Sequence, residues 1–230
     1  MTVSLSLWDF MRLHVEALFT HDDAGRLLAV NEPGGAAAPR FFLGRTADGD
    51  AWWFRRDVGA ALVSDLETLC EALPAGLDID PAPFVERLGR DEPVQKVWAG
   101  PAYRFPETPA ADEGTVRVTA DNAALLSPHL EAWLGDVAAG MPMAVALAGE
   151  KAVAVCGSVR MTREAHEAGV ETHRDSRGRG YGARAVKAWA RVVREMDRVP
   201  LYSTSWENGG SRGLASRLEL IHFGNDLHIT

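Results

Sequence analysis

The sequence predicts an α/β protein in two parts, and three observations carry this prediction. Three stretches, 143–147, 152–159 and 167–172, read as successive strands, with only short turn signals between them. A glycine-rich stretch then leads into an amphipathic helical pattern at about 181–196. Residues 108–114 are rich in proline, alanine and acidic residues, as linkers are. We therefore expect two domains, 1–109 and 113–230.

The length, composition and net charge of the chain argue against several classes of protein. The chain has 230 residues, of which 47% are apolar and 24% charged, an ordinary globular composition. A net charge of −8 argues against non-specific nucleic-acid binding, because that mode depends on neutralising phosphates. Asp9, Arg12 and Glu16 interrupt the N-terminal apolar run, so neither a signal peptide nor a membrane span is expected. These features predict a cytoplasmic protein without nucleic-acid or membrane partners.

Cysteine and histidine spacing gives no metal site. Cys70 and Cys156 lie within apolar patterns and are interpreted as buried thiols. The seven histidines lack paired metal spacing, and no G-x-S-x-G motif is present. Neither a metal centre nor a serine nucleophile is expected.

The N-terminal half predicts helices and strands in alternation. A helix is expected from Ser4 or Ser6 to Phe19, with Ser6 as a candidate N-cap and His14 as a packed core histidine on its apolar stripe. Adjacent aromatic residues at Trp52 and Trp53 are typical of a half-buried strand and favour packing over base stacking. The other expected elements are strands at 26–31, 40–45 and 50–55, the last two joined through Asp48-Gly49, and helices at 58–73 and 81–88.

The stretch from Thr172 to Ala183 carries the chemical signal. Three glycines in five residues, Gly178, Gly180 and Gly182, allow the backbone conformations that bring N–H groups close to a ligand. The helix that follows offers the positive end of its dipole. Because Arg177 and Arg179 add positive charge, phosphate is the expected ligand.

Spacing separates three phosphate-binding patterns. The P-loop fails, because no Lys-Ser or Lys-Thr follows the glycines. The dinucleotide pattern fits formally at Gly178, Gly180 and Ala183, but the residues before it are charged and only 47 residues follow Ala183. The third pattern, R-x-x-G-x-G/A, is met by Arg177, Gly180 and Gly182. Here the chain resembles the GNAT N-acetyltransferases, in which this loop cradles the pyrophosphate of acetyl-coenzyme A.

The flanks agree with this resemblance, which covers about 115–230. Residues 200–204 read as a short strand, and Glu207-Asn208 opens a second helix. Upstream, a strand is expected at 115–119 and a helix at 127–138, with Ser127 as N-cap and Pro128 at the first helical position. The apolar side of the second helix is expected to comprise Leu214, Ala215, Leu218 and Ile221. The resemblance implies an α+β fold with a mixed, mostly antiparallel sheet flanked by helices.

The resemblance also implies the ligand and its contacts. Acetyl-coenzyme A would be the co-substrate, and no metal would be required. Asn208 matches the family's coenzyme-contacting asparagine, a role compatible with that of an N-cap. The residues implied to bind the coenzyme are Val170, Thr172, Arg177, Gly178, Arg179, Gly180, Tyr181, Gly182, Asn208 and Ser211.

In the family, the strand before the loop often supplies the base that deprotonates the amine. For this base, Glu167 is our first choice, Glu171 the second and His173 the third. Gly169, between the two glutamates, is expected to mark a bulge whose free N–H groups bind the thioester carbonyl. Where many members have a tyrosine that protonates the thiolate, this chain has Ala215. Ser211, Tyr202 or water would then take that role.

The resemblance implies direct transfer of an acetyl group to a primary amine, in the first place on a small molecule and in the second on a peptide. The alternative is a non-catalytic acyl-coenzyme A-binding module, which the missing tyrosine favours. Neither the acceptor nor the acyl preference follows from the sequence. For the N-terminal half three roles stay open: a wall of the acceptor site, a homodimer face, or a degenerate copy of the second half.

Overall fold

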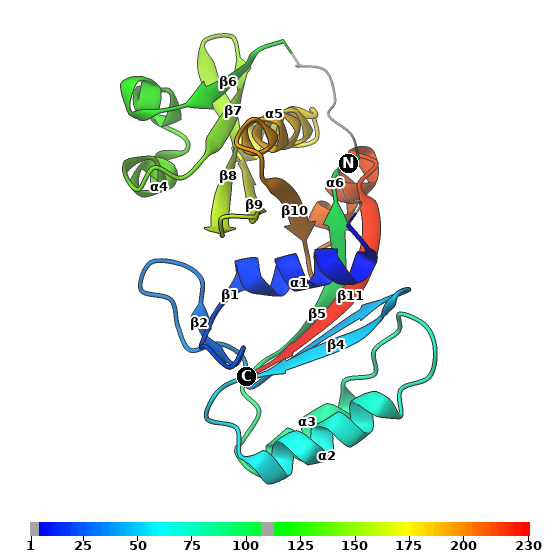
Figure 1. Cartoon of the computed structure of the whole chain (residues 1–230). Helices are drawn as coiled ribbons and strands as arrows, with labels where there is room; N and C mark the ends of the chain where they lie inside the picture. Colours follow the sequence, from blue (N-terminus) through cyan, green and yellow to red (C-terminus); the bar gives the residue numbers. More distant parts are fainter. Residues whose placement is uncertain (1–4, 107–112) are drawn as a thin grey trace. The chain divides into compact units, whose positions relative to one another are not determined.

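The structure is a computed structural model that describes residues 5–106 and 113–230 (Figure 1). The predicted linker, 108–114, therefore lies mostly outside the described residues. The chain folds into two compact units. The first unit comprises Met1–Tyr103, Ser203–Asn208 and His222–Thr230, and the second comprises Arg104–Tyr202 and Gly209–Ile221.

The first unit contains a small sheet with helices on both faces. The strand order is β4-β3-β11-β5, and β3 pairs antiparallel with both β4 and β11. β1 and β2 form a separate antiparallel pair. The elements are α1 (Leu7–Leu18), β1 (Phe19–His21), β2 (Leu27–Val30), β3 (Phe41–Thr46), β4 (Gly49–Phe54), α2 (Ala60–Glu71), α3 (Ala82–Gly89), β5 (Val97–Arg104) and β11 (Ile221–Ile229).

Strand register decides which side chains face which helices. Phe41 and Leu43 of β3 pack in one core cluster with Leu66 of α2 and Phe84 of α3. The opposite face lies under α1, as the position of Gly44 shows: a Cβ there would lie 2.4 Å from Cγ of Met11. Glycine at this position is therefore what lets α1 approach the sheet so closely.

His14 is confirmed as a core histidine. It is fully buried on α1, lies edge-on to Phe223, and its Nε2 lies 2.6 Å from Oδ2 of Asp226 in β11. The helix start is also confirmed, because Ser6 and Asp9 form a reciprocal capping box at the beginning of α1.

The second unit is a five-stranded sheet carrying the glycine-rich loop. Its order is β10-β9-β8-β7-β6; the pairs are antiparallel except for β10 and β9, which are parallel. The elements are β6 (Thr115–Val118), the 3₁₀ turns η1 (Ala120–Leu126) and η2 (Glu131–Trp133), α4 (Leu134–Ala138), β7 (Met143–Ala148), β8 (Lys151–Met161), β9 (Ala165–Thr172), η3 (Arg174–Ser176), α5 (Tyr181–Glu195), β10 (Val199–Ser203) and α6 (Gly209–Arg217).

The amphipathic helix α5 forms as predicted. Its apolar stripe, Val186, Trp189, Ala190 and Val193, is buried. Met196, counted with that stripe in the sequence, lies just beyond the helix and is 38% exposed. α5 packs on β7, β8 and β9, so the glycine-rich loop at its start is fixed to the end of β9.

Two predicted helical assignments were wrong. Instead of one helix over 127–138, the chain makes the single 3₁₀ turn η2 and a short α4 there, while η1 ends before this range. Thr119 and Asn122 form a capping box that begins a helical turn earlier, and Ser127 is extended, with its hydroxyl bonded to Glu131. The second wrong assignment concerns Ile221, which does not continue α6 but is the first residue of β11.

The two predicted thiols are both buried, and burial raises the pKa of Cys70 to about 12 and that of Cys156 well above its usual value. In the described part of the chain, no group of histidine, cysteine and acidic side chains is arranged to hold a metal ion. Nor does any described helix combine the length and apolar character that crossing a membrane requires.

Candidate functional site

The glycine-rich loop has the backbone geometry that its sequence predicted. Gly178 and Gly180 adopt left-handed conformations, with φ of 74° and 85°, and Gly180 is the N-cap of α5. Gly182 is needed for a different reason: a Cβ there would lie 2.9 Å from Oγ1 of Thr172. Two glycines thus turn the chain into the helix, and the third lets the helix start lie against β9.

Positive groups and amides gather at this helix start. An α-helix leaves its first N–H groups without helical acceptors, here those of Tyr181, Gly182 and Ala183, since the first helical bond runs from Arg184 N–H to the Gly180 carbonyl. The helix dipole is positive at this end. The Nε of Arg177 donates to the carbonyl of Thr172 at 3.2 Å, which fixes the side chain beside the loop. Arg179 is exposed within the loop. The arrangement suits an anion.

One further cation here was not predicted from the sequence. Arg217, at the end of α6, places Nη1 3.9 Å from where a Cβ of Gly180 would lie. Sequence alone gave no reason to single it out, because it is one exposed arginine on a helix whose contact with the loop is tertiary.

β9 and β10 pair over only part of their length. The registered partners are Val199↔Ala165, Pro200↔His166 and Leu201↔Glu167, whereas β9 continues to Thr172. The segment 168–172, between Glu167 and the loop, thus extends beyond the registered pairs.

The two faces of β9 have different neighbours. Val170 and Thr172 lie toward α5, because a Cβ at Gly182 would lie 4.0 and 2.9 Å from their side chains. By strand alternation Glu167, Gly169 and Glu171 share the other face, as expected. The Glu167 side chain is buried, with 2% of the residue exposed, whereas Glu171 is exposed.

The predicted bulge at Gly169 was wrong. The register shift lies on β8 between Ser158 and Arg160, while Gly169 stays paired with Gly157. A Cβ at Gly169 would lie 2.1 Å from Cγ1 of Val159 and 3.2 Å from the Trp133 ring, so glycine is required here by packing.

Trp133 lies over this glycine pair. Its ring would be 2.8 Å from a Cβ at Gly157, and its indole N–H donates to Oε2 of Glu171 at 2.7 Å. From the same two segments, the rings of His129 and His173 lie 3.9 Å apart between centroids. Sequence reasoning missed Trp133 and His129, because the segment 127–138 was expected to be a single helix.

The remaining predicted residues are less closely grouped. Ala215 is buried in α6 at 1% exposure, and the hydroxyl of Tyr202, also buried, donates to the carbonyl of Ser211 at 3.4 Å. Asn208 is exposed and groups with the first unit, whereas the loop and Ser211 belong to the second.

Comparison with known proteins identifies a family for the second half of the chain. Residues 110–219 match the model of the acetyltransferase (GNAT) family. No curated protein matches the chain.

Among solved structures, a GCN5-related N-acetyltransferase from Kribbella flavida is similar, with 13% identity, a TM-score of 0.50 and coverage of 99% of this chain and 96% of that one. A functionally unknown conserved protein from Staphylococcus epidermidis has 14% identity, a TM-score of 0.51 and coverage of 96% of both chains. A GNAT-family putative acetyltransferase from Novosphingobium aromaticivorans has 18% identity and a TM-score of 0.47; the match covers 59% of this chain and only 65% of that one. At these identities the likeness concerns the fold.

Proposed function

Residues 110–219 match the acetyltransferase (GNAT) family model, and from this premise we propose that the chain moves an acetyl group from acetyl-coenzyme A to a primary amine of a small molecule. The observation that carries the proposal is the loop before α5, with its left-handed Gly178 and Gly180. The family typically uses acetyl-coenzyme A, whose pyrophosphate is the anion such a loop suits.

The residues around the loop fit such a ligand. The amides at the start of α5 would bind the pyrophosphate, assisted by Arg177, Arg179 and Arg217. Left-handed backbone at Gly180 supports this assignment, since a side chain there would be strained and would face Arg217. Val170 and Thr172 would offer backbone groups from the part of β9 beyond its registered pairs with β10. Ser211, in α6, is proposed as a further contact.

For the base we propose Glu167 ahead of Glu171 and His173. Glu167 is buried at the last registered pair of β9 with β10, which suits a group acting on a reaction kept from water. The Glu171 carboxylate already accepts the Trp133 indole N–H, so Glu171 is better suited to positioning Trp133.

The proposed chemistry is direct attack. Glu167 accepts a proton from the ammonium form of the substrate, the neutral nitrogen forms a bond to the acetyl carbonyl carbon, and the carbon–sulfur bond breaks. The nitrogen then gives up a second proton to solvent, which leaves the neutral amide. Most of the rate would come from holding both substrates together, because effective molarities for well-oriented groups reach about 10⁵ M or more. The base would add about 10²-fold or more.

The leaving thiolate requires a proton from elsewhere. Ala215 offers no proton, which leaves Ser211, Tyr202 or water. This same alanine favours the second candidate, a module that binds acyl-coenzyme A without turning it over.

Release of coenzyme A, followed with a thiol reagent across a panel of small primary amines, tests the proposal. We expect turnover with at least one amine, and a loss of at least tenfold in kcat for Glu167→Gln with unchanged acetyl-coenzyme A affinity. Glu150→Gln, in the exposed β7–β8 turn, is the matched control. Tight binding without turnover of any amine would favour the binding module. Full activity of Glu167→Gln would instead show that the base is another residue.

A further inference from the structure

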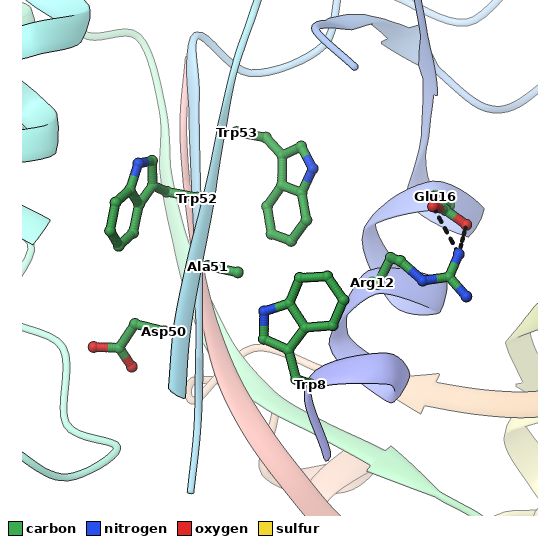
Figure 2. Close-up of a pocket in the computed structure, with 7 residues that line it drawn as sticks. All are labelled: Trp8, Arg12, Glu16, Asp50, Ala51, Trp52 and Trp53. Carbon is green, nitrogen blue, oxygen red and sulfur yellow. Dashed lines mark hydrogen bonds and ion pairs between the residues drawn. The ribbon is translucent and has the colours of Figure 1, made fainter. Parts of the chain in front are cut away.

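The first unit contains a hollow lined by three of the chain's seven tryptophans (Figure 2). Its volume is about 410 Å³, within the range of small-molecule sites. One wall is a stripe on α1 with the spacing i, i+4, i+8, and the other is β4, the edge strand of its sheet. The lining residues are Trp8, Arg12, Glu16, Asp50, Ala51, Trp52 and Trp53.

Strand alternation determines which side chains point into this space. Ala51 pairs with Gly44 and Trp53 with Phe42, on the sheet face that lies under α1. Figure 2 shows the rings of Trp8 and Trp53 directed into the same space between α1 and β4, while Trp52 points to the other side of the strand. The methyl group of Ala51 forms a small floor between the two indoles.

The walls are held in place without a ligand. The backbone N–H of Leu7 donates to Oδ2 of Asp48 at 2.7 Å, which ties the start of α1 to the β3–β4 turn. The capping box of Ser6 and Asp9 fixes the same helical turn. Trp53 is supported by edge-on contact with Phe42, with ring centroids 5.5 Å apart. The hollow is therefore preorganised, although Trp8 remains 40% exposed.

The charged groups of the wall neutralise one another. Arg12 donates to both carboxylate oxygens of Glu16, at 2.9 and 2.8 Å. Asp50 pairs with the buried Arg45 at 3.1 Å. An anionic ligand would thus compete with Glu16 for Arg12 and would meet a chain of net charge −8. What the hollow offers most strongly is the electron-rich faces of two indoles.

We propose that this hollow binds a small organic ammonium ion between Trp8 and Trp53. The indole is the aromatic side chain that attracts cations best, and a large, weakly hydrated ammonium gives up little solvation on entering. Ala51 leaves room for its alkyl groups, and the acidic balance of the chain favours a cation. None of its lining residues is among those proposed above for acetyl transfer.

Calorimetric titration of the full chain with choline and with 3,3-dimethylbutan-1-ol tests this proposal, because the two probes share a shape and differ in charge. We expect saturable binding of choline and at least tenfold weaker binding of the alcohol. Trp8→Ala should weaken choline binding at least tenfold, and Ala51→Leu, which fills the floor, should abolish it. Trp206→Phe, which alters a tryptophan of similar exposure (43%) outside the hollow, is the matched control and should bind as the parent does.

Circular dichroism and the thermal midpoint would establish that each variant is folded. Equal affinity for the uncharged alcohol would overturn the ammonium assignment in favour of an apolar site. No choline binding by the parent chain, or undiminished binding by folded Trp8→Ala and Ala51→Leu variants, would overturn the site itself.

Discussion

The indole N–H of Trp133 donates to Oε2 of Glu171 at 2.7 Å, and this bond joins the turn before α4 to the strand that leads into the glycine-rich loop. The ring lies over Gly157 and Gly169, a paired position on β8 and β9 where no side chain would fit. One interaction thus fixes the face of β9 that also carries Glu167.

A double-mutant cycle should detect this bond. We expect Trp133→Phe and Glu171→Gln to be coupled by about 0.5–1 kcal/mol in the free energy of unfolding, a modest value because Glu171 is exposed. Urea unfolding of the two single variants and the double variant measures it. Strictly additive effects would mean that the bond contributes nothing to stability.

Gly180→Ala should be costly because of backbone conformation. At a φ of 85° an alanine is disfavoured by about 1–2 kcal/mol, and acetyl-coenzyme A affinity should fall at least tenfold as the loop shifts. Gly213→Ala is the matched control: it lies inside α6 with open space around it and should stabilise the chain by about 0.5–1 kcal/mol. Equal effects of the two substitutions on unfolding and binding would contradict this account of the loop.

Asp226 should make the first unit sensitive to acid. Burial by itself would raise the pKa of this carboxyl, but the charge and hydrogen bond of His14, together with His228, outweigh burial and lower the pKa below its usual value. A carboxyl with a lowered folded pKa stabilises the fold above its unfolded value, near 3.9, and loses that contribution as the pH falls through the folded value.

Asp226→Asn should therefore lower the free energy of unfolding by about 3 kcal/mol at pH 7, because the substitution leaves the buried His14 without its charged partner. Chemical unfolding measured between pH 7 and pH 3 would show that the free energy of unfolding falls less on acidification in Asp226→Asn than in the parent chain. Asp23→Asn, in an exposed turn, should change neither the free energy of unfolding at pH 7 nor its decrease on acidification. An equally steep acid dependence in Asp226→Asn would assign that dependence to other carboxyls.

His166 should remain neutral well below pH 6. Burial, and then the charge of Arg198, lowers its pKa to about 4, while its Nδ1 lies 2.9 Å from Oγ of Ser158. The unfolded chain binds this proton near pH 6.5, so stability should decrease as the pH falls from about 6.5 to about 4. NMR titration of the His166 ring measures the midpoint directly, and a midpoint above 6 would contradict the assignment.

Local patterns predicted the part of the fold that depends on local chemistry. The glycines before α5, the stripe from Val186 to Val193 and the Ser6 cap each follow from a few neighbouring residues, and each has the predicted conformation in the structure. Strands with short turns between them, such as β7 and β8, were located for the same reason.

Elements that depend on distant partners were missed. β5 contains Pro101, which argues against a strand in isolation, and β11 follows a helix without a clear alternating pattern. The position of Trp133 depends on a glycine pair on two other strands, and that of Arg217 on the packing of α6 near the loop. No spacing along the chain encodes such contacts.

The most direct test of the proposed function is a thermal-shift comparison of acetyl-coenzyme A with NADH, each near 100 times its Kd. A ligand at that concentration stabilises the folded state by about 2.7 kcal/mol, which is enough to raise the thermal unfolding midpoint by several degrees in a chain of this size. We predict a shift with acetyl-coenzyme A alone, as expected of a pyrophosphate loop that serves acetyl transfer. A shift with NADH alone would mean that Gly178, Gly180 and Ala183 form a dinucleotide site, and the proposed acetyl transfer would be contradicted.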